Sequence, residues 1–123
     1  MECTRIHGYD GDDFAHVVSE RFTRARLPHT CMECGEQIHP GQLCYRERFV
    51  LHGKFTEHFT CHACKSLRDE LFCSWTYGAL WEDLRAEIDS ADGELSMVAI
   101  SRLHPKARAK VCDILEEYWA GGD

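Results

Sequence analysis

Two Cys-x-x-Cys pairs constrain this chain more than any other feature of its sequence. Cys31 and Cys34 form the first pair, and Cys61 and Cys64 form the second pair 27 residues after Cys34. A structural zinc ion takes four ligands at the corners of a tetrahedron, and each pair can supply two adjacent corners from one tight turn. The sequence therefore predicts one structural zinc ion held by these four thiolates.

Histidines beside the pairs leave one alternative ligand set open. His29, His58 and His62 each lie within three residues of a cysteine, so one of them could replace a thiolate. Four thiolates already satisfy the ion, which favours the all-cysteine site. The other cysteines after the first pair, at positions 44, 73 and 112, are expected to be small side chains in the core.

The compartment decides how eight cysteines are interpreted. In a secreted chain of 123 residues they could form a disulfide framework, whereas in a reducing compartment paired cysteines are typical metal ligands. The chain starts with "MECTRIHGYDGDDF", which carries charges where a signal peptide is apolar, and it has no run of about 18 apolar residues. We therefore expect a cytoplasmic protein with no membrane contact.

A hairpin is predicted between the two cysteine pairs. Residues 43–51 alternate as a strand does, with Leu43, Tyr45, Glu47, Phe49 and Leu51 on one face. "LHGK" then supplies a turn in which Gly53 can take a positive φ, and "FTEHFT" continues as the returning strand. Residues 12–25 fit either a helix or a strand, and we favour a strand after Ser19.

The rest of the chain is predicted to be helical. Thr60 is the expected N-cap of a helix over residues 61–72, and "SWTYGALWEDLRAEID" suggests a second helix. A break at "SADGEL" precedes a short helix near residues 97–103, and Pro105 suits the first turn of a last helix that ends at Gly121 and Gly122. The inward-facing residues of this last helix are expected to be Ala107, Val111, Ile114, Leu115 and Tyr118.

Residues 25–72 resemble a treble-clef zinc finger, in which a cysteine knuckle, a hairpin and a helix with two ligands at its start follow one another. The segments "ARLPHTCMECGEQIHPGQLCYR" and "GKFTEHFTCHAC" are similar to those of small uncharacterised phage and prophage proteins. That resemblance implies a phage origin and therefore the host cytoplasm as the location. It implies no activity.

Catalysis has weak support in the sequence. "TCHACKSL" resembles the cysteine-rich helix of nucleases of the HNH type, whose catalytic metal needs histidines on the hairpin and on the helix. His52, His58 and His62 are candidates, but the chain has no Asp-His pair and no asparagine on that helix. We therefore predict no catalytic residues and keep an HNH-like nuclease as a second alternative.

Charge favours a protein partner over a nucleic acid. The net charge is −7, and residues 73–123 hold ten acidic and five basic side chains. Arginines interleaved with aromatics around the hairpin could bind nucleic acid, but Glu20, Glu47 and Glu57 lie among them, which favours a solvated sheet face. Nucleic-acid binding is therefore the first alternative.

We expect an α+β fold made of an N-terminal segment at residues 1–18, a treble-clef zinc module at 19–72 and a helical region at 73–123 packed on that module. The predicted function is non-enzymatic binding of a host or phage protein, with inhibition of a host function as one outcome. Aromatic residues of the helical region, which dominate binding hot spots in general, are candidate anchors: Trp75, Tyr77, Trp81, Tyr118 and Trp119.

Overall fold

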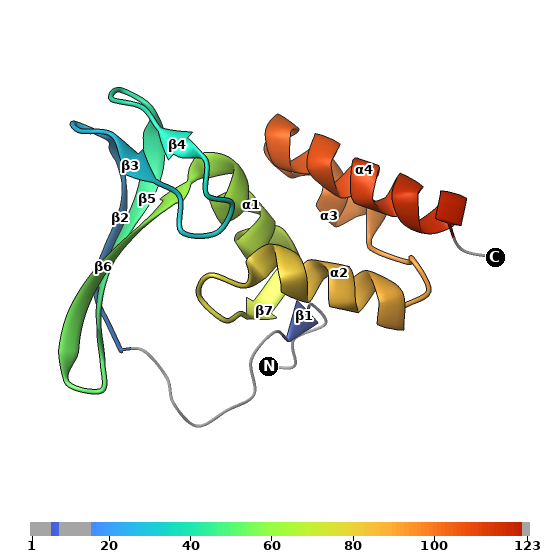
Figure 1. The fold of residues 1–123 in the computed structure, drawn as a ribbon, viewed down its shortest axis with the longest axis horizontal. Helices are drawn as coiled ribbons and strands as arrows, with labels where there is room; N and C mark the ends of the chain where they lie inside the picture. The colour runs from blue at the N-terminus through green and yellow to red at the C-terminus, as the bar shows by residue number, and fades with distance from the viewer. Residues whose placement is uncertain (1–5, 8–15, 122–123) are drawn as a thin grey trace.

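The computed structural model describes residues 6–7 and 16–121. These residues form both strands and helices (Figure 1). A three-stranded sheet lies at one side, and the helix α1 (His62–Leu71) lies between this sheet and the other helices. Most of the predicted N-terminal segment falls outside the described residues. The mixed composition of helix and strand agrees with the predicted α+β class.

The sheet consists of the predicted hairpin and one additional strand. β5 (Leu43–Leu51) pairs with β6 (Lys54–Cys61) and with β2 (His16–Arg24), both in antiparallel register. β2 confirms a strand after Ser19 and extends it to His16. The predicted faces of β5 are also confirmed, since Tyr45, Glu47 and Phe49 are buried while Arg48 is exposed.

The first cysteine pair lies in a small hairpin of its own. β3 (His29–Thr30) pairs with β4 (Gln37–Ile38), and the turn between them carries Cys31 and Cys34. The amide of Met32 donates to the carbonyl of Phe59 at 3.0 Å, which joins this turn to β6. The knuckle, hairpin and helix therefore follow one another in the predicted order.

The prediction for the start of α1 was wrong by one residue. Cys61, not Thr60, is the N-cap, because the Cys61 side chain accepts a hydrogen bond from the amide of Cys64. Thr60 instead lies within β6 and has a fully buried side chain. A thiolate can cap a helix because the free amides and the positive end of the helix dipole stabilise its negative charge.

The helical half differs from the prediction at its beginning. Residues 72–74 form β7 (Phe72–Ser74), which pairs in parallel with β1 (Ile6–His7), and no helix begins until Leu80. The carboxylate of Glu33 accepts from the amides of Gly78 and Leu80, both at 3.1 Å, which fixes this loop to the knuckle. The helices that follow are α2 (Leu80–Ser90), α3 (Met97–Ser101) and α4 (Pro105–Gly121).

The last two helices agree with the predicted pattern. α3 begins after Ser96, whose hydroxyl accepts from the amide of Ala99, and α4 starts at Pro105 as expected. Ala107, Val111 and Ile114 of α4 are buried. Leu115 and Tyr118 are partly buried against the same cluster, so the predicted inward face is confirmed.

One hydrophobic core joins the cysteine region to the helices. Its buried members include Cys31 and Cys64 from the two cysteine pairs and Leu84 and Val111 on α2 and α4. The division into modules at residues 18 and 72 stays a prediction. Within the described ranges, no helix is long and apolar enough to cross a membrane.

Candidate metal centre

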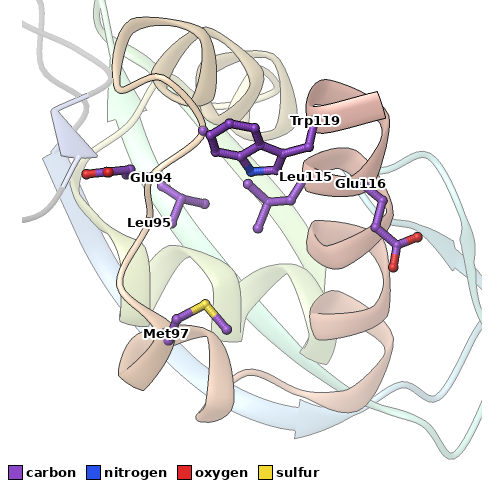
Figure 2. A pocket seen from close by; sticks show the side chains of 7 residues that line it. Glu94, Leu95, Met97, Leu115, Glu116 and Trp119 are labelled. Atoms are coloured by element: carbon purple, nitrogen blue, oxygen red, sulfur yellow. The ribbon is translucent and has the colours of Figure 1, made fainter. Parts of the chain in front are cut away.

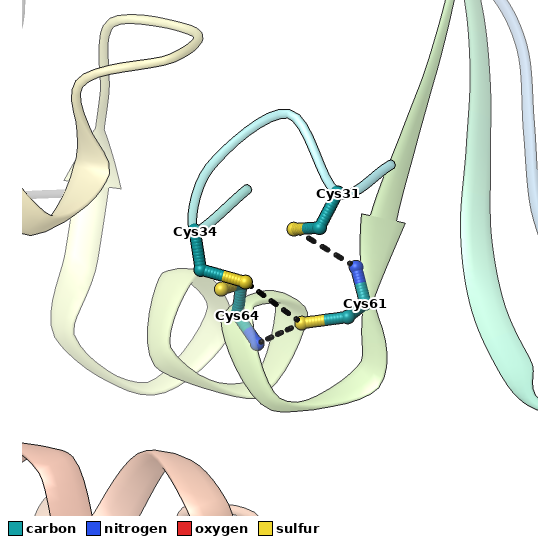
Figure 3. Close-up of side chains that lie close together, drawn as sticks. All are labelled: Cys31, Cys34, Cys61 and Cys64. Carbon is teal, nitrogen blue, oxygen red and sulfur yellow. Dashed lines mark hydrogen bonds between the residues drawn. The ribbon is translucent and has the colours of Figure 1, made fainter. Parts of the chain in front are cut away.

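Three elements bring the four predicted cysteines together (Figure 3). Cys31 and Cys34 come from the turn between β3 and β4, Cys61 ends β6, and Cys64 lies in the first turn of α1. In Figure 3 the four sulfur atoms point toward one another in the space between this turn and the helix. They are the one group of three or more possible metal ligands in the described part of the chain.

The distances between the sulfurs match the size of a tetrahedral site. All four Sγ atoms lie within 4.8 Å of one another, and those of Cys34 and Cys61 are 3.8 Å apart. A tetrahedron with metal–sulfur bonds of about 2.3 Å has sulfur–sulfur edges of about 3.8 Å. The four cysteines could therefore hold one metal ion with little movement of their side chains.

The backbone of the first turn is shaped by Gly35. Its φ of +76° lies in the left-handed region, which glycine adopts without the cost of a Cβ atom. The amide of Gly35 donates to the carbonyl of Cys31 at 2.9 Å, and the amide of Cys31 donates to the carbonyl of Glu36 at 2.9 Å. These two bonds close the turn that places Cys34 beside Cys31.

Backbone amides donate to two of the sulfurs. The amide of Cys61 donates to Sγ of Cys31 at 3.3 Å, and the amide of Cys64 donates to Sγ of Cys61 at 3.5 Å. Such bonds favour the thiolate over the thiol because they stabilise negative charge on sulfur.

The thiols also shift one another's pKa. Hydrogen bonds from Cys34, Cys61 and Cys64 lower the pKa of Cys31. Hydrogen bonds to Cys31 and Cys34 raise the pKa of Cys61, and those to Cys31, Cys34 and Cys61 raise the pKa of Cys64. Without a cation these raised pKa values favour protons on Cys61 and Cys64, so a metal ion would displace protons as it binds.

Trp81 is a member of the site that the sequence did not reveal. Its indole Nε1 donates to Sγ of Cys64 at 3.2 Å, and the ring is buried at the start of α2. Contacts of this kind orient a ligand and tune the charge on it. Trp81 lies 17 residues after Cys64 and in a different helix, α2, so the spacing of the cysteines does not predict this hydrogen bond.

The candidate histidines lie around the site without converging. His29 stacks on Phe59 with ring centroids 3.6 Å apart, His58 contacts Phe49, and His62 contacts His104. His52 is at the hairpin turn with a φ of +52°. The four sulfurs therefore complete a ligand set with none of these imidazoles.

The remaining cysteines have different environments. Cys44 is fully buried in β5, and Cys112 of α4 packs partly buried against the core, as predicted. Cys73 is half-buried in β7 but is disulfide-bonded, so the prediction of a simple packing thiol was wrong there.

Comparison with protein-family models, with curated proteins and with solved structures found no match to this chain. The treble-clef interpretation and the similarity to phage proteins therefore stay predictions. What the chain itself establishes is a mixed fold built around a four-cysteine cluster that could hold a metal ion.

Proposed function

We propose that this chain is a non-enzymatic binding protein whose fold is held by one zinc ion and whose acidic helical half docks a basic segment of another protein. Four converging thiolates support zinc, because structural zinc sites are tetrahedral and sulfur-rich, although iron accepts the same donor set. A treble-clef arrangement is the fold that we propose for residues 25–72.

The observation that carries the docking proposal is an exposed apolar groove at the end of the helical half (Figure 2). The groove has a volume of about 600 Å³ and lies between the turn that follows α2 and the C-terminal part of α4. Met97 is 69% exposed and Trp119 is 60% exposed. Large apolar side chains exposed together mark a contact surface more often than isolated ones do.

Charge around the groove indicates the chemistry of its partner. In Figure 2, Leu95 and Leu115 face each other at the centre, whereas Glu94 and Glu116 lie on opposite sides. The helical region as a whole has ten acidic and five basic residues. A segment with an apolar anchor flanked by lysines or arginines would complement this surface in both shape and charge.

The absence of catalysis is part of the same proposal. Support comes from the separation of the candidate histidines, since His58 contacts Phe49 and Tyr77 whereas His62 contacts Phe22 and His104. A nuclease of the HNH type needs such groups on one catalytic metal. Metal-dependent nicking of plasmid DNA that is lost when His58 or His62 is replaced would contradict this part.

A photo-crosslinking experiment in host cells tests the docking proposal. A photoreactive amino acid is placed at position 97 in the groove, and, as a control, at exposed position 102 outside it. We expect one protein to be crosslinked from position 97 and not from 102, through a peptide rich in lysine or arginine. Equal crosslinking from both positions, or attached peptides without a basic excess, would contradict the proposal.

The purified partner then allows a quantitative test. Trp119→Ser should weaken its binding by about 30-fold, which corresponds to the loss of a hot-spot residue. Phe55→Ser serves as the matched control, because Phe55 is an even more exposed aromatic and lies on the distant hairpin. Whether that partner is a host protein, and whether binding inhibits it, stays an expectation drawn from the phage resemblance.

A further inference from the structure

The outer face of the sheet, which points away from α1, concentrates positive charge. Cross-strand pairing places Arg21 of β2 directly opposite Arg46 of β5, and Arg48 is the next outward residue along β5. Arg21 and Arg48 are exposed, and Arg46 is partly exposed. The three arginines line a cavity of about 240 Å³ together with Ser19 and Glu20.

Acidic groups neutralise only part of this charge. The carboxylate of Glu57 pairs with both Arg46 and Arg48, and Nε of each donates to its Oε2 at 2.8 Å. The two guanidinium groups lower the pKa of Glu57, so it is ionised at neutral pH. Among the described residues, no carboxylate forms an ion pair with Arg21.

The pairing of Arg21 with Arg46 therefore lacks a structural explanation. Like charges directly opposite each other on one sheet face destabilise the sheet. Three arginines against the carboxylates of Glu57 and Glu20 leave an excess of about one positive charge beside the cavity. An anionic ligand would remove this repulsion, and guanidinium groups bind phosphate with two parallel hydrogen bonds.

Aromatic rings lie on the same face. Phe55 near the hairpin end of β6 is 81% exposed, and Phe59 lies four residues further along the same side of the strand. Residues that far apart on a strand are separated by about 13 Å. Phe59 is already stacked on His29 and has Arg46 at 6.0 Å from its ring centroid, so Phe55 is the ring with a free face.

We propose that this face binds single-stranded nucleic acid, with phosphates at Arg21, Arg46 and Arg48 and a base stacked on Phe55. Basic grooves combined with exposed rings are the usual means of binding single strands, whose bases are free to stack. The acidic helices lie on the other side of α1, which restricts attraction to the sheet face (Figure 1). This site is independent of the groove proposed for a protein partner.

Fluorescence anisotropy with the metal-loaded protein tests the proposal. The probes are labelled single-stranded dT12 and rU12, and a 12-base-pair DNA duplex, each at several salt concentrations. We expect single strands to bind with an affinity that falls as salt rises. Each phosphate contact should add about 0.7 to the slope of log affinity against log salt.

Three variants locate the site. Arg21→Gln with Arg48→Gln should weaken binding by about ten-fold at low salt and reduce the slope by about 1.4. Phe55→Ala should weaken binding at least about five-fold without changing the slope, because it removes stacking and no charge. Arg85→Gln with Arg102→Gln is the matched control in the helical half, and it should leave affinity nearly unchanged.

Several results would overturn the proposal. These are no binding of single strands at low salt, an equal loss in the control variant, or tighter binding of the duplex with no effect of Phe55→Ala. Displacement of dT12 by polyglutamate, again with no effect of Phe55→Ala, would assign the face to an acidic peptide instead. Trp119→Ser should not change this binding, so failure here and failure of the protein-docking proposal can be told apart.

Discussion

At the scale of single residues, Trp81 links the metal centre to the helical half. Its indole donates a hydrogen bond to Cys64 while its ring packs in the core, with the ammonium of Lys110 at 4.1 Å from the ring centroid. A single side chain therefore contacts a ligand sulfur and two helices. Loss of this hydrogen-bond donor should therefore lower the affinity for the metal ion more than it lowers the stability of the fold.

Trp81→Phe should weaken metal retention. The variant removes the donor to Cys64 but keeps an aromatic ring, so we expect metal affinity to fall about 10- to 100-fold, as it does when an outer contact to a ligand is lost. Competition with a chromogenic chelator measures this change. Trp75→Phe is the control, and an equal loss there would show that the hydrogen bond has no special role.

Gly93 is the residue on which the geometry of the groove depends. It has a φ of +78°, and a Cβ atom there would lie 2.8 Å from ring carbons of Tyr118 and 2.9 Å from Trp119. The rings at the end of α4 can therefore pack against the turn only because this position has no side chain. The same turn carries Glu94 and Leu95 of the groove.

Gly93→Ala should destabilise the protein and displace Trp119. Left-handed backbone costs about 1–2 kcal/mol for a residue with a Cβ atom, and the contact with the two rings adds to it. Gly53→Ala is the matched control, because Gly53 has a φ of +76° and nothing within 4 Å of a Cβ atom. Urea unfolding should show the larger loss for Gly93→Ala, and equal losses would mean that crowding contributes nothing.

At the scale of secondary-structure elements, a buried ion pair joins the hairpin to α1. Nη2 of Arg68 lies 2.9 Å from Oε1 of Glu47, and both side chains are almost completely buried. The hydroxyl of Tyr77 donates to Oε2 of Glu47 at 3.0 Å. The guanidinium also lies over Trp75, 4.6 Å from its ring centroid, so β5, α1 and the loop before α2 meet at one charged centre.

Glu47→Gln should be strongly destabilising because Arg68 would remain buried without a compensating charge. Removal of one partner from a buried pair costs about 3–5 kcal/mol, whereas replacing both partners by apolar residues is often neutral. Urea unfolding should therefore show a large loss for Glu47→Gln and a recovery in Glu47→Leu with Arg68→Met. A double variant less stable than the single one would contradict this account.

The elements that the sequence predicted well are those specified by local patterns. The alternation in residues 43–51 identified the faces of β5, and Pro105 identified the start of α4. The spacing of the two pairs also predicted that the four cysteines converge, because a shared metal ion requires the same local turn in each pair.

The errors come from contacts between distant parts of the chain. The helix predicted over "SWTYGALWEDLRAEID" begins only at Leu80, because the local pattern cannot show that Glu33 binds the amides of the loop before α2. β7 forms by pairing with β1, which begins at Ile6, and Cys61 displaced Thr60 as the cap of α1 because its sulfur belongs to the cluster. The sequence shows the arginines of the outer sheet face. It does not show that Arg21 lies opposite Arg46, because that depends on the register of β2 against β5.

At the scale of the whole molecule, we expect the fold to depend on the proposed metal ion, because two of the four clustered cysteines are also core residues. Cys31 and Cys64 are buried members of the cluster that extends to α4. Binding of structural zinc contributes about 10–16 kcal/mol in small domains, which is comparable to or larger than the whole stability of a typical domain, about 5–15 kcal/mol. Loss of the metal should therefore unfold much more of the chain than the turn that carries Cys31 and Cys34.

Removal of the metal by a strong chelator should abolish most of the far-UV circular dichroism signal of the strands and helices. Circular dichroism measures this loss, and the emission of Trp81 should change with it because its indole contacts a ligand sulfur. Addition of zinc should restore both signals. An unchanged spectrum in demonstrably metal-free protein would show that the core is stable without the ion.

Elemental analysis of the purified protein measures whether Cys31, Cys34, Cys61 and Cys64 hold one zinc ion. We expect one zinc per chain in the unchanged protein and in Cys112→Ser, whose thiol lies outside the cluster, but a substoichiometric amount in Cys64→Ser. No bound metal in the unchanged protein, or a full complement in Cys64→Ser, would contradict this expectation.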